Sequence, residues 1–382
     1  MNKYYHERKN CVICNNIIVE TYFLNDKKLP ITTNFIDKNE NCVIIPYNIL
    51  KCNYCNCYQN KYLGKIELVY NENHNNTVIS KIWENNYESF FNFIIKSNIN
   101  LKNDNKILEI GAGNNYIVNL FKKNSFNNYT IIEPIITNKI EDVKYITGWL
   151  EDTEINETFD LIILSHVLEH LYIPDDLFRI KSKFIAINIP NIPKYLDDNI
   201  LNFLNIEHIY YFEEEHIEYL FKKNNYKKIA KDYYLDHSIF MIFEYDDKNN
   251  QDNNYLINIC KNKNIDNRFN LFFNNINKLI VYINNTLINN KHIKYAVFPG
   301  NLYIQYLIML GLNLDSVEFL YDNNTSKKDK FLYGTHLICK NIDFFINNND
   351  YTIVLLGFIY NHEVKKTLDK YNIKYIEYNI SI

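Results

Sequence analysis

The chain has 382 residues and a net charge of −4, and hydrophobic residues make up 47% of it. This length exceeds one ordinary hydrophobic core, so two or three domains are expected. The charge gives no support for nucleic-acid binding, and no apolar run reaches the ~20 residues that a membrane helix needs. The first residues lack the apolar segment of a signal peptide. We therefore expect a cytoplasmic protein, whose eight cysteines are thiols or metal ligands rather than disulfides.

Four cysteines near the N-terminus form two Cys-x-x-Cys pairs. Cys11 and Cys14 make the first pair, and Cys52 and Cys55 make the second. Four thiolates in paired knuckles are typical of a closed tetrahedral Zn²⁺ site, although buried, inert thiols are the alternative. With four protein ligands the ion has no open position. The sequence therefore predicts a structural zinc ion in an N-terminal domain at residues 1–78.

Strands and helices alternate from residue 80 onward. Apolar periodicity predicts a helix over residues 80–99, and short apolar strands are expected at residues 107–110 and 161–164. A long helical stretch, from Arg268 to about Asn290, precedes a second alternating segment. This pattern predicts a doubly wound parallel sheet in a central domain at residues 79–246, a linker at residues 245–255 and a Rossmann-like α/β domain at residues 247–382.

Candidate ligand contacts follow the strands of the central domain, because ligands bind beyond the carboxyl ends of strands in open α/β sheets. The stretch "EIGAGN" supplies Glu109, Gly111 and Gly113, and its glycines allow a sharp turn and a close approach of a ligand. Glu133 ends the next predicted strand, where it can accept hydrogen bonds from both ribose hydroxyls. Further candidates are Asp152 for an adenine ring, and Ser165 and His166 after the following strand.

Two cofactors fit a glycine turn of this kind. A nicotinamide dinucleotide favours Gly-x-Gly-x-x-Gly, but the third glycine position here is Tyr116. S-adenosylmethionine has no pyrophosphate, and its cationic groups suit acidic strand ends. The ordered set of motifs therefore predicts an S-adenosylmethionine site, with an ordinary glycine-rich turn as the alternative.

With these motifs the chain resembles the class I S-adenosylmethionine-dependent methyltransferases. More narrowly, it is similar to the three-domain sugar C-methyltransferases that act on nucleotide-linked deoxysugars. Those enzymes carry a four-Cys zinc domain, a methyl-donor domain and a Rossmann-like domain, and all three parts occur here in that order. In "FLYDNNTSKKDKFLYGT", Asp322, Lys327 and Gly334 occupy places that the family shares. The resemblance implies a nucleotide-sugar substrate.

The resemblance also implies a mechanism, in which a proton next to a sugar ketone is removed and the enolate attacks the donor methyl. The stretch "LNIEHIYYF", residues 204–212, carries the candidate groups. His208 is the expected base, since a neutral imidazole can take a proton at working pH. Glu207 is its expected partner. Tyr211 or Tyr210 is the expected substrate contact, able to donate a hydrogen bond to an enolate oxygen.

The sequence departs from this family next to the Glu-His pair. Asn205 and Ile206 stand where the family has Tyr and His, and His74 stands where a Tyr is common. An oxygen or nitrogen acceptor needs only one base, so a sugar O- or N-methyltransferase stays open, as do a non-catalytic donor-binding relative and a purely structural role for the pair. Glu169 and His170 are expected to pack or cap a helix. The sugar, its nucleotide and the oligomeric state are not determined by the sequence.

Overall fold

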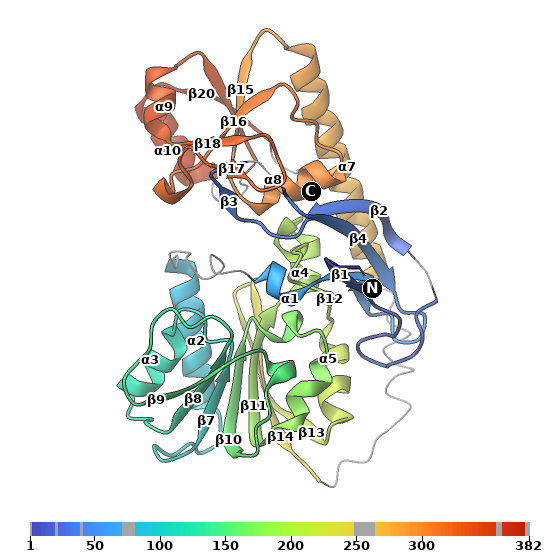
Figure 1. The fold of residues 1–382 in the computed structure, drawn as a ribbon, viewed down its shortest axis with the longest axis vertical. Helices are drawn as coiled ribbons and strands as arrows, with labels where there is room; N and C mark the ends of the chain where they lie inside the picture. Colours follow the sequence, from blue (N-terminus) through green and yellow to red (C-terminus); the bar gives the residue numbers. More distant parts are fainter. Residues whose placement is uncertain are drawn as a thin grey trace.

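Three groups of strands organise the chain, and the computed structural model describes residues 2–19, 22–38, 41–70, 81–247, 264–356 and 361–378. Figure 1 shows the central α/β part at the bottom, the C-terminal α/β part at the top and the N-terminal strands beside and between them. The predicted boundary at residue 78, His74 and residues 248–255 of the predicted linker lie outside the described residues. The domain limits themselves stay a prediction.

The central part is built on a seven-stranded sheet with the order β13-β14-β11-β10-β7-β8-β9. All neighbours are parallel except β14, which runs antiparallel to both β11 and β13. The predicted doubly wound sheet is confirmed. Its strands are β7 (Ile107–Ile110), β8 (Tyr129–Glu133), β9 (Val143–Thr147), β10 (Thr158–Ser165), β11 (Lys181–Pro190), β13 (Tyr226–Tyr234) and β14 (Ser238–Tyr245).

Both faces of this sheet are buried, as its continuous apolar strands require. In β10, Ile162 and Leu164 pack into one core while Leu161 and Ile163 pack into another, because successive side chains of a strand point to opposite faces. Helices α2 (Lys81–Lys96) and α3 (Tyr116–Lys123) cover one face, and α5 (Glu214–Lys222) covers the other (Figure 1). The helix predicted over residues 80–99 is confirmed as α2.

The N-terminal strands form two small sheets. β1 (Tyr5–Glu7) pairs with β6 (Tyr62–Gly64). The other sheet has the order β12-β5-β4-β2. Its outer strand, β12, comes from far along the chain and pairs with β5 through Tyr210 and Tyr211. The strand bounds are β2 (Tyr22–Pro30), β4 (Ile44–Lys51), β5 (Tyr58–Asn60) and β12 (Tyr210–Tyr211).

The C-terminal part holds a second seven-stranded sheet, with the order β20-β19-β15-β16-β18-β17-β3. Its first five strands are parallel, which confirms the predicted Rossmann-like unit. β3, from the N-terminal region, completes the edge by pairing with β17. The strands are β3 (Phe35–Ile36), β15 (Lys294–Phe298), β16 (Val317–Tyr321), β17 (Phe331–Leu332), β18 (Ile338–Lys340), β19 (Tyr351–Leu355) and β20 (Lys374–Glu377).

The remaining helices lie around and between these sheets. The predicted long helix is confirmed as α7, and α4 contacts it, so the central and C-terminal parts meet there (Figure 1). The α-helices are α1 (Ile66–Val69), α4 (Ile192–Asp197), α7 (Asn264–Asn289), α8 (Leu302–Leu310), α9 (Ile342–Asn347) and α10 (Asn361–Lys370). The 3₁₀ turns are η1 (Leu150–Asp152), η2 (Leu168–His170), η3 (Pro174–Arg179), η4 (Leu201–Phe203) and η5 (Thr325–Lys327). Within the described ranges, every helix is too short or too polar to span a bilayer.

Candidate functional site

The glycine turn after β7 has the shape that the sequence predicts. Gly111 and Gly113 both have left-handed backbone angles, with φ of 69° and 54°. A Cβ at Gly111 would lie 2.6 Å from Cγ2 of Val167, so no side chain fits there. A Cβ at Gly113 would meet no atom within 4 Å. The turn therefore leaves open space at Gly113, where a cofactor could approach the backbone.

Glu133 lies at this turn, as predicted. It ends β8, is buried, and its Oε2 accepts the Gly113 N–H at 2.9 Å. A carboxylate held at the carboxyl end of the second strand can turn to ribose hydroxyls when a nucleoside enters.

Replacing this carboxylate should weaken donor binding. We expect Glu133→Ala to raise the Kd for S-adenosylhomocysteine about 10- to 100-fold, because a hydrogen bond to a charged group contributes about 1.5–3 kcal/mol. Isothermal titration calorimetry measures this. Glu141→Ala, which removes an exposed carboxylate, should bind like the wild type, and equal affinities for the two variants would remove Glu133 from the donor site.

The other predicted donor residues lie in different surroundings. Glu109 is buried in β7 and accepts a hydrogen bond from Tyr129 Oη at 2.8 Å, and Asp152 is exposed on η1. Ser165 accepts a hydrogen bond from Asn188 at 2.9 Å, and the N–H of His166 donates to the Asn188 carbonyl at 2.7 Å. Ser165 and His166 thus belong to a polar network at the end of β10. The next residue, Val167, packs against Gly111 of the glycine turn.

The burial of Glu109 makes stability depend on pH. Burial raises its pKa to about 8, so the folded state holds the proton more tightly than the unfolded state. Its contribution to stability is complete below the unfolded pKa, near 4.5, and is lost as the pH rises through about 8. Each pKa unit corresponds to about 1.4 kcal/mol. We therefore expect the free energy of unfolding of Glu109→Gln to rise relative to that of the wild type, by up to several kcal/mol, between pH 5 and pH 9. Thermal melts across this range test it, and the exposed Glu141→Gln should show no such trend.

The Glu207–His208 pair lies in a turn between η4 and β12. The helix α4 and the turn η4 separate the pair from the end of β11. Nδ1 of His208 is 3.2 Å from the carbonyl oxygen of Phe203, and Asn60 of β5 donates to the His208 carbonyl at 3.3 Å. The pair is therefore held from the N-terminal sheet as well as from the central part.

Glu169 and His170 meet this pair in space. The side chain of Glu207 is only 10% exposed, and its Oε2 is 3.8 Å from Nδ1 of His170. The rings of His170 and His208 have centroids 5.0 Å apart. Glu169 Oε1 is 4.0 Å from Nε2 of His170 and 3.3 Å from Nδ1 of His166. We call Glu169, His170, Glu207 and His208 the Glu–His cluster.

The sequence predicts that Glu169 and His170 pack against or cap a helix that follows β10. The structure has only the short turn η2 there, entered through His166 with a φ of 54°. The signal that could have found the two residues is their place, directly after a strand whose end faces the glycine turn.

Burial shifts the pKa values of three members of the cluster. It raises the pKa of Glu207 to about 8 and of Glu169 to about 7, and it lowers the pKa of His208. Carboxyls whose pKa lies near neutral pH, beside an imidazole that burial keeps neutral, are suited to general acid–base chemistry. A cavity of about 10 Å³, room for about one water, touches Glu169 and His208.

The two tyrosines of β12 point to opposite faces. Tyr210 donates to the backbone carbonyls of Leu168 and Leu171, the latter at 2.9 Å, and so holds η2 in place. The Tyr211 hydroxyl is buried, 2.7 Å from the Tyr47 hydroxyl. These contacts are structural, and the substrate contact expected of Tyr211 or Tyr210 stays a prediction.

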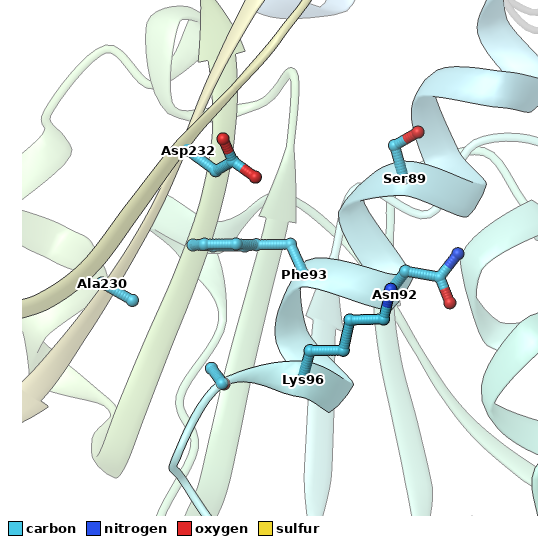
Figure 2. A pocket seen from close by; sticks show the side chains of 7 residues that line it. Ser89, Asn92, Phe93, Lys96, Ala230 and Asp232 are labelled. Atoms are coloured by element: carbon cyan, nitrogen blue, oxygen red, sulfur yellow. The ribbon is translucent and has the colours of Figure 1, made fainter.

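A larger hollow lies away from these groups. It measures about 420 Å³ and is lined by α2 and β13, including Phe93, Lys96 and Asp232 (Figure 2). None of the predicted site residues lines it.

The four predicted zinc ligands converge. Sγ of Cys11 is 3.5 Å from Sγ of Cys55, and Sγ of Cys14 is 3.6 Å from Sγ of Cys52. Tetrahedral Zn–S bonds of about 2.3 Å place sulfurs about 3.8 Å apart, so the spacing fits one ion. Gln59 Nε2 also donates to Cys11 Sγ at 3.3 Å, as expected around a thiolate. The cluster could therefore hold a zinc ion.

The three C-terminal residues that match the sugar C-methyltransferases have structural contacts. Lys327 Nζ bridges Asp322 Oδ2 at 2.7 Å and the Gly300 carbonyl at 2.9 Å. Gly334 has a φ of 77°, and a Cβ there would lie 2.5 Å from Pro30. The absence of a side chain at Gly334 thus lets the C-terminal part pack on β2.

Comparison with known proteins matches the central part of the chain to a protein family. Residues 84–231, which carry the glycine turn, Glu133 and the Glu–His cluster, match the protein-family model described as a methyltransferase domain. The central part of the chain is therefore a methyltransferase domain. Its sheet is that of the class I methyltransferases, as the sequence predicts. No curated protein matches the chain.

Several solved structures are similar to less than half of the chain. Magnesium protoporphyrin IX methyltransferase from Synechocystis PCC 6803 with bound SAH is 9% identical, with a TM-score of 0.35, over 44% of this chain and 90% of that one. The 1,6-didemethyltoxoflavin-N1-methyltransferase from Burkholderia thailandensis is 10% identical, with a TM-score of 0.35, over 44% and 82%. An S-adenosylmethionine-dependent methyltransferase from Clostridium acetobutylicum ATCC 824 is 14% identical, with a TM-score of 0.32, over 42% and 92%.

Proposed function

We propose that this methyltransferase methylates a nucleotide-linked sugar at a carbon next to a ketone. The observation that carries the proposal is the position of the Glu–His cluster. Val167, the residue before η2, packs on the glycine turn, where a Cβ on Gly111 would lie 2.6 Å from it. Glu169 and His170 follow this contact by two and three residues, which links the cluster to the proposed donor loop. The order of the three parts, and the match of Glu207 and His208 to the Glu-His pair of the sugar C-methyltransferases, support a nucleotide-linked sugar as the substrate.

The Glu207–His208 pair is the unit that removes the proton. The Phe203 carbonyl can only accept a hydrogen bond, so Nδ1 of His208 carries the hydrogen and Nε2 keeps its lone pair. Glu207, with a pKa raised to about 8 by burial, can hold the proton near neutral pH. The C–H bond breaks and its electrons form the enolate while the proton passes to the pair. The enolate carbon then bonds to the donor methyl as the bond from that methyl to sulfur breaks.

Methylation at a sugar oxygen or nitrogen is the second candidate, because Asn205 and Ile206 cannot act as an acid or a base. One structural detail offsets this departure. The N–H of Ile206 donates to Tyr306 Oη at 2.9 Å, and Tyr306 Oη donates to Asn205 Oδ1 at 3.4 Å, so a phenol from α8 contacts both departing residues. Tyr306 supports the carbon acceptor in preference to oxygen or nitrogen.

We also propose that Cys11, Cys14, Cys52 and Cys55 hold one Zn²⁺ in a structural role. All four coordination positions of a tetrahedral ion are taken by sulfur, which leaves none for substrate. The cysteines belong to the same core as Ile209 and Phe212, which flank β12.

The function is tested in two steps. Calorimetry with S-adenosylmethionine and S-adenosylhomocysteine establishes donor binding. Incubation with 4-keto and 3-keto sugar nucleotides, followed by mass spectrometry and NMR of the product, then identifies the methylated atom. A new C–CH₃ group confirms the proposal, and an O- or N-methyl product selects the second candidate. Donor binding without any methylated product would indicate a non-catalytic relative.

A further inference from the structure

Three members of the Glu–His cluster converge on one point. One ligand atom each from Glu169, His170 and His208 lies within 4.8 Å of the other two. Glu169 is 4% exposed. Nδ1 of His166 lies 3.3 Å from its Oε1, but neither carboxyl oxygen accepts a hydrogen bond of good geometry from the described residues. A buried carboxylate without a donor is costly unless a positive charge is supplied. The arrangement thus calls for a cation between these side chains.

Both imidazoles are anchored through Nδ1. His208 Nδ1 donates to the Phe203 carbonyl at 3.2 Å, so the lone pair of this imidazole is on Nε2. His170 Nδ1 is 2.6 Å from the Tyr70 hydroxyl, so Nε2 faces Glu169. Metal-binding histidines are oriented in this way, with the second ring nitrogen held by a carbonyl, a hydroxyl or a carboxylate.

The distances and donor types suit a metal ion. Nε2 of His170 and Oε1 of Glu169 are 4.0 Å apart, which two bonds of about 2.0–2.2 Å to one ion can span. Two neutral imidazoles and one carboxylate form the donor set of first-row divalent metals that keep open coordination positions. This set contains no sulfur and shares no residue with the four cysteines.

We propose that Glu169, His170 and His208 bind a divalent transition-metal ion whose open position takes the carbonyl oxygen of the acceptor. The second half of this proposal rests on the proposed function. The ion would stabilise the charge that develops on the enolate oxygen. Because the Nε2 lone pair of His208 is then used by the ion, Glu207 is the member of the pair that receives the proton from carbon.

A Co²⁺ titration of the full chain, with zinc already in the cysteine site, tests the proposal. We expect one equivalent to bind with the visible absorption of nitrogen and oxygen ligation and without thiolate charge transfer. Glu169→Gln should weaken Co²⁺ binding at least about tenfold. Tyr70→Phe, which keeps every ligand, should weaken it about tenfold by releasing His170. His292→Asn, which removes an exposed imidazole, should bind like the wild type.

The outcomes separate this proposal from the proposed function. Failure to bind Co²⁺ at this site while S-adenosylhomocysteine binds normally would overturn the metal site alone. Co²⁺ binding that is equal in the wild type, Glu169→Gln and Tyr70→Phe would place the ion elsewhere and also overturn it. Loss of S-adenosylhomocysteine binding by the wild type would instead count against the methyltransferase function.

Discussion

His208→Asn should lower turnover by at least about 100-fold while leaving donor affinity within about threefold of the wild type. General-base groups contribute about 10²–10⁴-fold to rate, and the same side chain is a ligand if the cluster binds an ion. Asn keeps a polar group that can still donate to the Phe203 carbonyl, so the turn should stay folded. Initial rates by mass spectrometry and the S-adenosylhomocysteine Kd by calorimetry give the two quantities.

Two further variants sharpen this experiment. Glu207→Gln should also lose turnover, because an amide cannot take up the proton. His292→Asn removes an exposed histidine far along the chain from the cluster and should retain full activity. Unchanged turnover in His208→Asn would contradict the assigned role of the cluster, and a parallel loss of donor binding would point to a folding defect instead.

The central sheet was predictable because its signals are local. Apolar runs mark β7 and β10, and the glycine turn follows β7 directly, so a single stretch of sequence contains both strand and turn. The place of Glu133 was predictable for the same reason, since it ends an apolar strand. The four cysteines were found by their spacing alone. In each case the chemistry and the geometry lie within a few neighbouring residues.

Two strands, β12 and β3, pair with sheets whose other strands come from distant parts of the chain, and these pairings could not be predicted. β12 and β3 are two residues long, too short for any periodic pattern, and they form because tertiary packing brings an unpaired edge beside them. The Glu–His cluster has the same origin. His170 and Glu207 are separated by η3, β11, α4 and η4, and their approach to 3.8 Å depends on η2 being a short turn rather than the expected helix. Pairings of this kind depend on the whole fold.

The second large effect is expected at the cysteine cluster. Cys52→Ser should reduce bound zinc well below the one ion per chain expected of the wild type, and destabilise the protein by several kcal/mol. Structural zinc binding contributes about 10–16 kcal/mol in finger peptides, so loss of one thiolate forfeits a substantial part. At about 2–4 °C per kcal/mol, the melting temperature should fall by roughly 10 °C. Elemental analysis and thermal melts measure both effects.

Cys42→Ser is the matched control, because Cys42 is a half-buried thiol outside the cluster that accepts the Gly334 N–H at 3.2 Å. It should keep its zinc and most of its stability. Equal zinc content and equal melting temperature in Cys52→Ser and Cys42→Ser would exclude a structural ion.

The zinc site should also influence the reaction, but less than it influences stability. Cys55 precedes β5, whose Asn60 donates its N–H to the Ile209 carbonyl at 2.9 Å and its side chain to the His208 carbonyl at 3.3 Å. His216 of α5 approaches the Cys55 carbonyl at 2.7 Å. Loss of a zinc ligand at the Cys52–Cys55 pair should therefore shift β5 and, through β5, the turn that holds His208. We expect Cys52→Ser, assayed below its melting transition, to lose several-fold in turnover and little in donor affinity, because the hydrogen bonds of Asn60 lead to the turn that holds His208, whereas Glu133 is bound to the Gly113 N–H.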